Sequence, residues 1–166
     1  MANAMVLLQS VTLAANSSIV TFSNINQSYR DLRLVISKVL TTQANSYTRF
    51  NGDSGNNYYD VGMGFNWQPV ASSFSDSAGP YFADHWGYGS TPQGSTTYMD
   101  ILDYSAIDKH KSALFRFNGM TTDGQWGMDV IAARWASTSA ITSITMTLSS
   151  GQYATGSTFS LYGVSA

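Results

Sequence analysis

Two aspartates, Asp100 and Asp103 in the segment MDILDY, come closest in this sequence to a catalytic carboxylate pair. Glycosidases hold two carboxyl groups about 5 to 9.5 Å apart across the bond that they cleave. Residues three apart on a strand point to opposite faces, so we expect these two side chains to diverge. We predict that one faces solvent and that the other ends the strand by binding backbone N–H groups. A glycan-cleaving enzyme is therefore disfavoured, and no catalytic residue is predicted.

The two histidines offer little support for other kinds of catalysis. His85 lies beside Asp84 in ADHWGYG, but no nucleophile motif such as G-x-S-x-G accompanies this pair. His110 lies between two lysines in a polar stretch. Because the chain has no cysteine, a transition-metal site would need both histidines and additional aspartates, and their spacing does not support one. We predict no catalytic histidine, no metal site of this kind and no cofactor.

The segment FNGDSGNNYYD gathers oxygen-bearing side chains that could bind calcium. An EF-hand loop needs a glycine at its sixth position and a distal glutamate, and here Gly52 and Gly55 are misplaced and glutamate is absent. A turn that joins two strands is the preferred interpretation. An ion held by loop carbonyls and carboxylates within 51–60 remains open.

Aromatic residues gather between positions 58 and 88, where the strand pattern is poorest. Tyrosine and tryptophan on loops can stack on sugars or anchor protein contacts. The alternative is that these loops fold back into a small satellite core. The aromatic group comprises Tyr58, Tyr59, Phe65, Trp67, Phe74, Tyr81, Phe82, Trp86 and Tyr88. The predicted interaction surface within it is Tyr58, Tyr59, Trp67, Tyr81, Trp86 and Tyr88.

The composition is typical of a β protein. Only 11% of the 166 residues are charged, against about a quarter in typical domains, and all ten acidic residues are aspartate. The net charge of −2 predicts no general attraction to nucleic acid or to a membrane surface. The first basic residue is Arg30 and no apolar run reaches the ~18 residues of a membrane span, so neither a signal peptide nor a membrane anchor is expected. We predict one soluble domain over residues 1–166.

Nearly every periodic segment repeats every two residues, which predicts about nine strands. Leu32, Leu34 and Ile36 share one face of DLRLVISKV, for example, and Trp126, Met128 and Val130 share one face of QWGMDVIAARW. The predicted strands are contained in residues 10–13, 18–24, 31–39, 47–52, 95–104, 112–119, 125–135, 140–150 and 156–164.

We expect an all-β fold, an antiparallel β-sandwich of jelly-roll type. Residues 61–95, which include all three prolines, are predicted to form a loop-rich aromatic insertion with at most one edge strand. Residues 140–150 and 156–164 should form a final hairpin whose last strand lies between earlier strands and closes the sandwich.

Several segments together resemble small structural proteins of tailed bacteriophages, notably cyanophages and marine phages. The resemblance covers most of the chain outside about 61–95. The segments that carry it, in order, are LLQSVTLAANSSIVTFSNINQSYRDLRLVIS, RFNGDSGNNYYD, MDILDYSAIDKHKS and RWASTSAITSITMTLSSGQYATGSTFSLYGV.

The resemblance implies a non-enzymatic virion protein with a jelly-roll-like sandwich, made in the host cytoplasm and displayed on the particle. A capsid decoration (cement) protein that binds neighbouring virion subunits is the leading hypothesis, and a homo-oligomer, by analogy a trimer, is expected. A tail fibre or appendage, or a carbohydrate-binding module that recognises host surface glycan through aromatic loops, remains the alternative.

Overall fold

The protein is described by a computed structural model that places residues 4–66, 71–83, 94–120 and 126–165. Twelve strands form within these residues, and no helix is present among them. The strands are β1 (Met5–Thr12), β2 (Ile19–Phe22), β3 (Asp31–Lys38), β4 (Ser46–Phe50), β5 (Tyr58–Asn66), β6 (Ala71–Gly79), β7 (Phe82–Ala83), β8 (Ser95–Leu102), β9 (Lys111–Met120), β10 (Trp126–Trp135), β11 (Ile144–Leu148) and β12 (Thr158–Val164).

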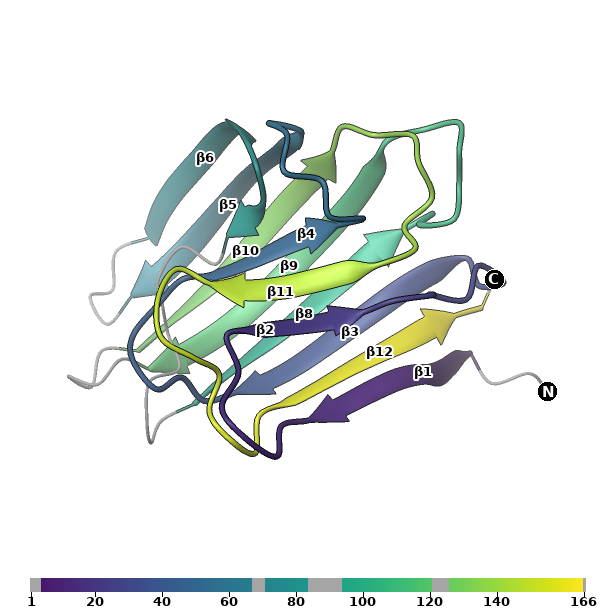
Figure 1. Cartoon of the computed structure of the whole chain (residues 1–166). Coiled ribbons are helices and arrows are strands. Elements are labelled where there is room, and N and C mark those ends of the chain that lie inside the picture. The colour runs from purple at the N-terminus through teal and green to yellow at the C-terminus, as the bar shows by residue number, and fades with distance from the viewer. Residues whose placement is uncertain (1–3, 67–70, 84–93, 121–125, 166) are drawn as a thin grey trace.

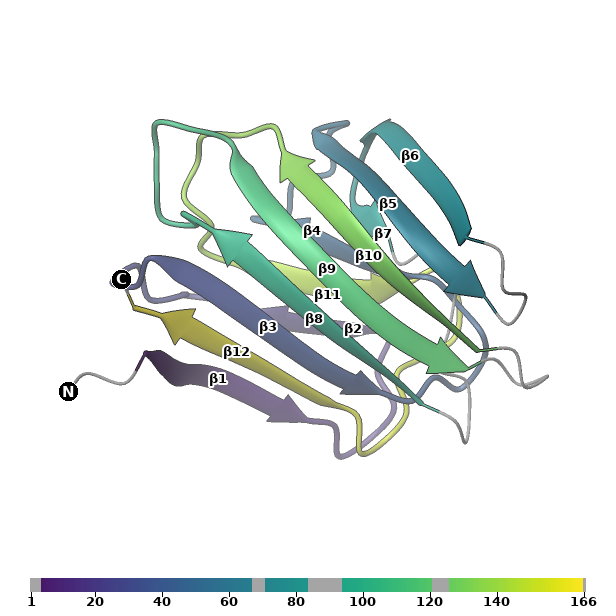
Figure 2. The same ribbon diagram turned by 180° about the vertical axis from the view of Figure 1, so that it is seen from behind.

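The strands form two antiparallel sheets, and the predicted all-β sandwich is confirmed. The large sheet has the order β1-β12-β3-β8-β9-β10-β5-β6, and the small sheet has the order β2-β11-β4-β7. The small sheet lies in front of the large one in Figure 1, and the open face of the large sheet is turned to the viewer in Figure 2. The jelly-roll detail stays a prediction.

The core lies between the two sheets because alternate side chains of each strand point inward. Leu34, Met99 and Phe115 contribute from the large sheet, and Phe50 and Met146 from the small one, each at most 6% exposed. Removing such a side chain from water contributes roughly 1.5 to 3 kcal/mol. Of the two alternating faces named from the sequence, Leu32, Leu34 and Ile36 of β3 point into the core, whereas Trp126, Met128 and Val130 of β10 point outward.

Most of β5 and all of β6 and β7 lie within residues 61–95, the region predicted as a loop-rich insertion with at most one edge strand, and that prediction is wrong for residues 61–66, 71–79 and 82–83. β5 and β6 each have nine residues and extend the large sheet beyond β10, while β7 forms an edge of the small sheet. Gly62 and Gly64 alternate with Val61, Met63 and Phe65 on β5, and β6 is rich in serine, so both segments contain residues of low strand propensity. All nine residues of β5 pair with β10, and this pairing stabilises the strand conformation that the residues of β5 do not favour by themselves.

The last strand has the predicted place but not the predicted partner. β12 lies between β1 and β3, as expected for a strand that closes the sandwich. The predicted hairpin of β11 and β12 is wrong, because β11 pairs with β2 and β4 in the opposite sheet. The connection crosses between the sheets at Tyr153, whose backbone exchanges two hydrogen bonds with Ser17 (2.8 and 3.0 Å).

Candidate binding surface

The outer face of the large sheet carries an apolar strip over β5 and β10. The strip consists of three directly opposite cross-strand pairs, each with one residue on either strand. These pairs are Phe65–Met128, Met63–Val130 and Val61–Ala132, and we call the six residues the apolar strip. They share one face because side chains alternate along each antiparallel strand.

The apolar strip is open to solvent in this chain. Val61 and Met63 are 57% and 59% exposed, and Phe65, Met128 and Val130 are 43%, 49% and 37% exposed. Single exposed apolar residues are common on protein surfaces, but a contiguous set marks an interaction site. The strip is therefore the feature of the described surface that most needs a function.

The borders of the strip are largely polar, although Leu114 of β9, which is 41% exposed, lies opposite Ala132. Ser73 and Ser75 of β6 lie opposite Met63 and Val61 and are exposed, and Arg116 of β9 lies opposite Val130. Beyond one end, the guanidinium of Arg134 lies 4.7 Å from the centre of the Tyr59 ring. An apolar centre with a polar rim is the usual arrangement of a protein interface.

A shallow groove of about 560 Å³ lies beyond the other end of the strip. Trp126, which is 54% exposed, is one of its lining residues. The groove combines an aromatic ring with hydroxyl and amide groups and has no charged side chain among its described lining residues. These are Ser37, Gly94, Ser95, Thr96, Asn118, Gly119, Met120, Trp126, Gly127 and Met128.

Asp100 lies on the outer face of β8 and is held between two arginines. Its carboxylate accepts hydrogen bonds from Arg33 Nε (2.6 Å) and Arg116 Nη2 (3.0 Å). The bond to Asp100 raises the pKa of the Arg33 guanidinium above its usual value. Both carboxylate oxygens of Asp100 are thus occupied in ion pairs that link β3, β8 and β9.

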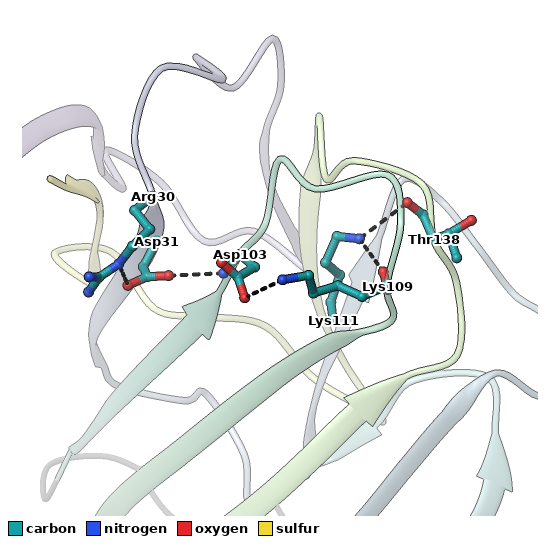
Figure 3. A network of polar contacts seen from close by, with 6 residues as sticks. All are labelled: Arg30, Asp31, Asp103, Lys109, Lys111 and Thr138. Carbon is teal, nitrogen blue, oxygen red and sulfur yellow. Dashed lines mark hydrogen bonds and ion pairs between the residues drawn. The ribbon is translucent and has the colours of Figure 1, made fainter. Parts of the chain in front are cut away.

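Asp103 lies just after β8 and belongs to a separate network, drawn in Figure 3. Its backbone N–H donates to Asp31 Oδ1 (2.9 Å), and its carboxylate accepts from Lys109 Nζ (3.3 Å). The prediction that one of the two aspartates binds backbone N–H groups is not met in these contacts, since the carboxylates of Asp100 and Asp103 both accept from basic side chains. Arg30 completes the network through an ion pair between its Nε and Asp31 Oδ2 (2.8 Å). Asp100 and Asp103 share no partner in these interactions.

Lys111 at the start of β9 is almost fully buried, at 1% exposure. Its ammonium group donates to the carbonyls of Lys109 (2.9 Å) and Thr138 (3.2 Å), as Figure 3 shows. Burial lowers the pKa of Lys111, because the charged form loses hydration. The side chain thereby ties the β8–β9 connection to the β10–β11 connection.

The predicted turn after β4 is held by hydrogen bonds to Asp53. Its carboxylate accepts from the amide of Gly55 (2.8 Å), from Asn57 Nδ2 (2.9 Å) and from Trp135 Nε1 (2.7 Å). Partial burial by itself raises the pKa of Asp53, but the bonds from Trp135, Asn57 and Gly55 outweigh it and hold the pKa below its usual range. These donors contact both oxygens of the Asp53 carboxylate.

Asn51 also holds this turn in place, through hydrogen bonds to the backbone of residues 140–143. Its backbone is left-handed (φ 53°), a conformation that asparagine tolerates better than most residues. Its side-chain Oδ1 accepts from the amides of Thr142 (2.8 Å) and Ser143 (3.1 Å), and its Nδ2 donates to the carbonyl of Ala140 (2.8 Å). The segment FNGDSGN thus joins two connections of the sandwich.

The predicted aromatic surface is only partly accessible. Tyr58 is 1% exposed and packs edge-on against Phe82 in the core, so its assignment to an interaction surface is wrong. β5 turns this side chain inward, opposite to Val61. Tyr59 and Tyr81 are half-buried, and Tyr81 stacks on Tyr47 with ring centres 3.9 Å apart.

Several predicted residues cannot be placed. Trp67, Trp86 and Tyr88 of the aromatic surface lie outside the described residues, as do Asp84 and His85. His110 is exposed at the end of the β8–β9 connection. The described residues contain no group of three or more His, Cys, Asp or Glu side chains that could hold a metal ion.

The sequence contains a signal for the apolar strip that the period-two pattern did not reveal. β10 carries apolar residues on both faces: Ile131 and Trp135 inward, and Met128 and Val130 outward. A strand that is apolar on both sides is typical of one covered on both sides. The described part of this chain covers one side of β10 and leaves the other exposed.

No protein-family model matches this chain, and no curated protein matches it either. Among the residues that the structure places, there is no helix long and apolar enough to cross a membrane. The fold and the apolar strip are therefore the observations on which a functional proposal rests.

Proposed function

We propose that this chain is a non-enzymatic structural protein of a tailed bacteriophage particle, a capsid decoration protein that binds neighbouring virion subunits. The apolar strip carries the proposal, because a contiguous exposed apolar surface with a polar rim is suited to another protein surface. The ordered sequence motifs that resemble phage virion proteins support the phage setting. Synthesis in the host cytoplasm followed by incorporation into the virion belongs to the same proposal.

The physical role follows from the strip. A protein that binds only the assembled particle stabilises that particle by mass action, because disassembly must also break the added interfaces. The low charge of the chain suits this role, since binding then depends on apolar contact rather than on ionic strength. Decorated particles should accordingly resist heat and osmotic shock better than undecorated ones, with little dependence on salt.

The test uses purified heads of the parent phage that lack this protein. The wild-type chain should cosediment with these heads and raise their disruption temperature. Met63→Lys, at the centre of the strip, should bind at least about tenfold more weakly, since it places a charge in the apolar contact. Leu7→Lys, an equally drastic change at a 53% exposed position of β1 outside the strip, is the matched control. Failure of the wild-type chain to bind heads would overturn the capsid assignment.

The groove beside Trp126 favours a second candidate, a tail appendage or carbohydrate-binding module that recognises host surface glycan. An exposed indole ring can stack on a sugar face, while Thr96 and Asn118 offer hydroxyl and amide partners. If this candidate is right, the chain binds host cells rather than heads, and Trp126→Ala abolishes that binding. Met63→Lys leaves cell binding unchanged in this case, which separates the two candidates.

A further inference from the structure

We propose that the apolar strip binds the same strip of a second copy of this chain, with the two large sheets packed face to face about a two-fold axis. This inference rests on the proposed function, because it makes the neighbouring subunit at the strip a second copy of this chain on the same particle, so that Met63→Lys weakens head binding by preventing the copies from pairing. The axis runs parallel to the strands, between β5 and β10.

The size of the face is sufficient for such a contact. The four strands β6, β5, β10 and β9 lie about 4.8 Å apart, and nine residues of β10 rise about 3.4 Å each, which gives roughly 600 Å². Two such faces bury on the order of 1,200 Å², the lower end of the range for specific protein interfaces. The strip forms the centre of this area, where interfaces are most apolar.

The cross-strand register makes the strip self-complementary. A two-fold axis parallel to the strands leaves each residue at the same height along its strand. It places β10 of the second copy over β5 of the first. Met63 then faces Val130 of the second copy, and the other two pairs of the strip exchange in the same way. Packed sheets about 10 Å apart allow such side chains to interdigitate.

Charge selects this axis over the alternative. With the axis along the strands, Arg116 faces Ser73 of the second copy, because β9 and β6 flank the strip on opposite sides. Arg134 likewise faces Tyr59 of the second copy, a contact of the kind it makes within its own chain. An axis across the strands at the Met63–Val130 row would instead place Arg116 against Arg116, and such a like-charge contact is unfavourable.

A first experiment measures the mass of the full chain by sedimentation over a concentration series. The wild-type chain should form a dimer. Met63→Lys should raise the dissociation constant at least about tenfold, while Leu7→Lys, the control at the far edge of the same sheet, should not. Circular dichroism and melting of both variants establish that they fold. A wild-type chain that remains monomeric at about 100 μM overturns the proposal.

A second experiment tests the axis with two variants that are each impaired alone. Met63→Lys mixed with Val130→Glu should restore a one-to-one dimer, because the introduced ammonium group of one copy then faces the introduced carboxylate of the other. An axis across the strands would bring residue 63 against residue 63 and would leave the mixture dissociated. Absence of rescue, or a trimer in solution, overturns the two-fold arrangement.

The two proposals fail in different ways. A monomer that still binds phage heads through the strip removes the second copy as the occupant but retains the decoration function. A strip-dependent dimer that binds no particle retains the interface and removes that function.

Discussion

At the scale of single residues, the polar side chains of the sequence motifs act mainly as links between loops. Asp53 joins the turn after β4 to Trp135 on β10 (2.7 Å). Asn51 joins the same turn to the connection before β11, and Lys111 joins two connections at one end of the sandwich. These side chains satisfy backbone groups that strand pairing leaves open, which explains why oxygen-rich segments here need not be metal or catalytic sites.

The buried hydroxyl of Tyr58 should make the free energy of unfolding fall at alkaline pH. Burial raises the pKa of its hydroxyl to about 12, whereas an unfolded tyrosine titrates near 10. Below pH ~10 both states hold the proton, and between about 10 and 12 only the unfolded chain releases it. The contribution of Tyr58 to the free energy of unfolding is therefore complete below pH ~10 and falls by about 1.4 kcal/mol per pH unit above it.

The comparison with Tyr58→Phe isolates this effect. At pH 7 the variant should be less stable by roughly 1 to 3 kcal/mol, because Phe50 N–H (3.0 Å) and Asp53 C=O (3.1 Å) lose the hydroxyl. The difference from wild type should shrink at pH 11, as measured by urea unfolding at both pH values. Tyr162→Phe, at a half-buried site on β12, is the control. A difference that does not change with pH contradicts the prediction.

One added methyl group at Gly64 should strongly reduce the free energy of unfolding. A Cβ at this position of β5 would lie 1.8 Å from Asp129 Oδ1 and 3.3 Å from the carbonyl of Met128. Asp129 is 1% exposed beneath the sheet and has little room to move. We expect Gly64→Ala to reduce the free energy of unfolding by about 1 to 3 kcal/mol, measured by urea unfolding. Gly79→Ala, whose Cβ would meet only Tyr81 C=O at 3.7 Å, should change it little; equal effects would contradict the steric explanation.

At the scale of the elements, β12 has the most important position in the large sheet. It pairs with β1 on one side and β3 on the other, and Phe159 and Leu161 are fully buried. A chain that lacks β12 exposes these core positions and leaves the facing edges of β1 and β3 without their partner. Unpaired strand edges promote aggregation.

A stop codon after Thr155 should therefore give insoluble protein without a cooperative melting transition. A stop after Val164 retains all of β12 and should give soluble, cooperatively folding protein. The measurements are the soluble fraction after expression and thermal melting by circular dichroism. Soluble, cooperatively melting product from the shorter chain would show that β12 is dispensable.

At the scale of the whole molecule, the two sheets differ in how they are covered. The inner faces bury each other, while the outer face of the large sheet presents the apolar strip to solvent over β5 and β10. This exposed apolar surface with its largely polar borders is the common basis of the decoration function and the two-fold pairing that we propose.

The sequence alone determined that the chain is an all-β sandwich, because alternation of apolar and polar residues is a local property of each strand. It also grouped Leu32, Leu34 and Ile36 on one face of β3, and this is the face that points into the core. β5 and β6 were missed because glycine and serine weaken their local pattern, and their order comes from pairing in the sheet.

Only the tertiary structure decided which side of β10 is buried and where the last two strands lie. β10 is apolar on both faces, so local alternation cannot choose, and the choice falls to the packing of Ile131 and Trp135 against the core. The separation of β11 and β12 into opposite sheets likewise depends on partners more than 100 residues earlier in the chain. Such long-range pairing leaves no local signature, which is why the position of the apolar strip comes from the fold, although the two apolar faces of β10 are visible in the sequence.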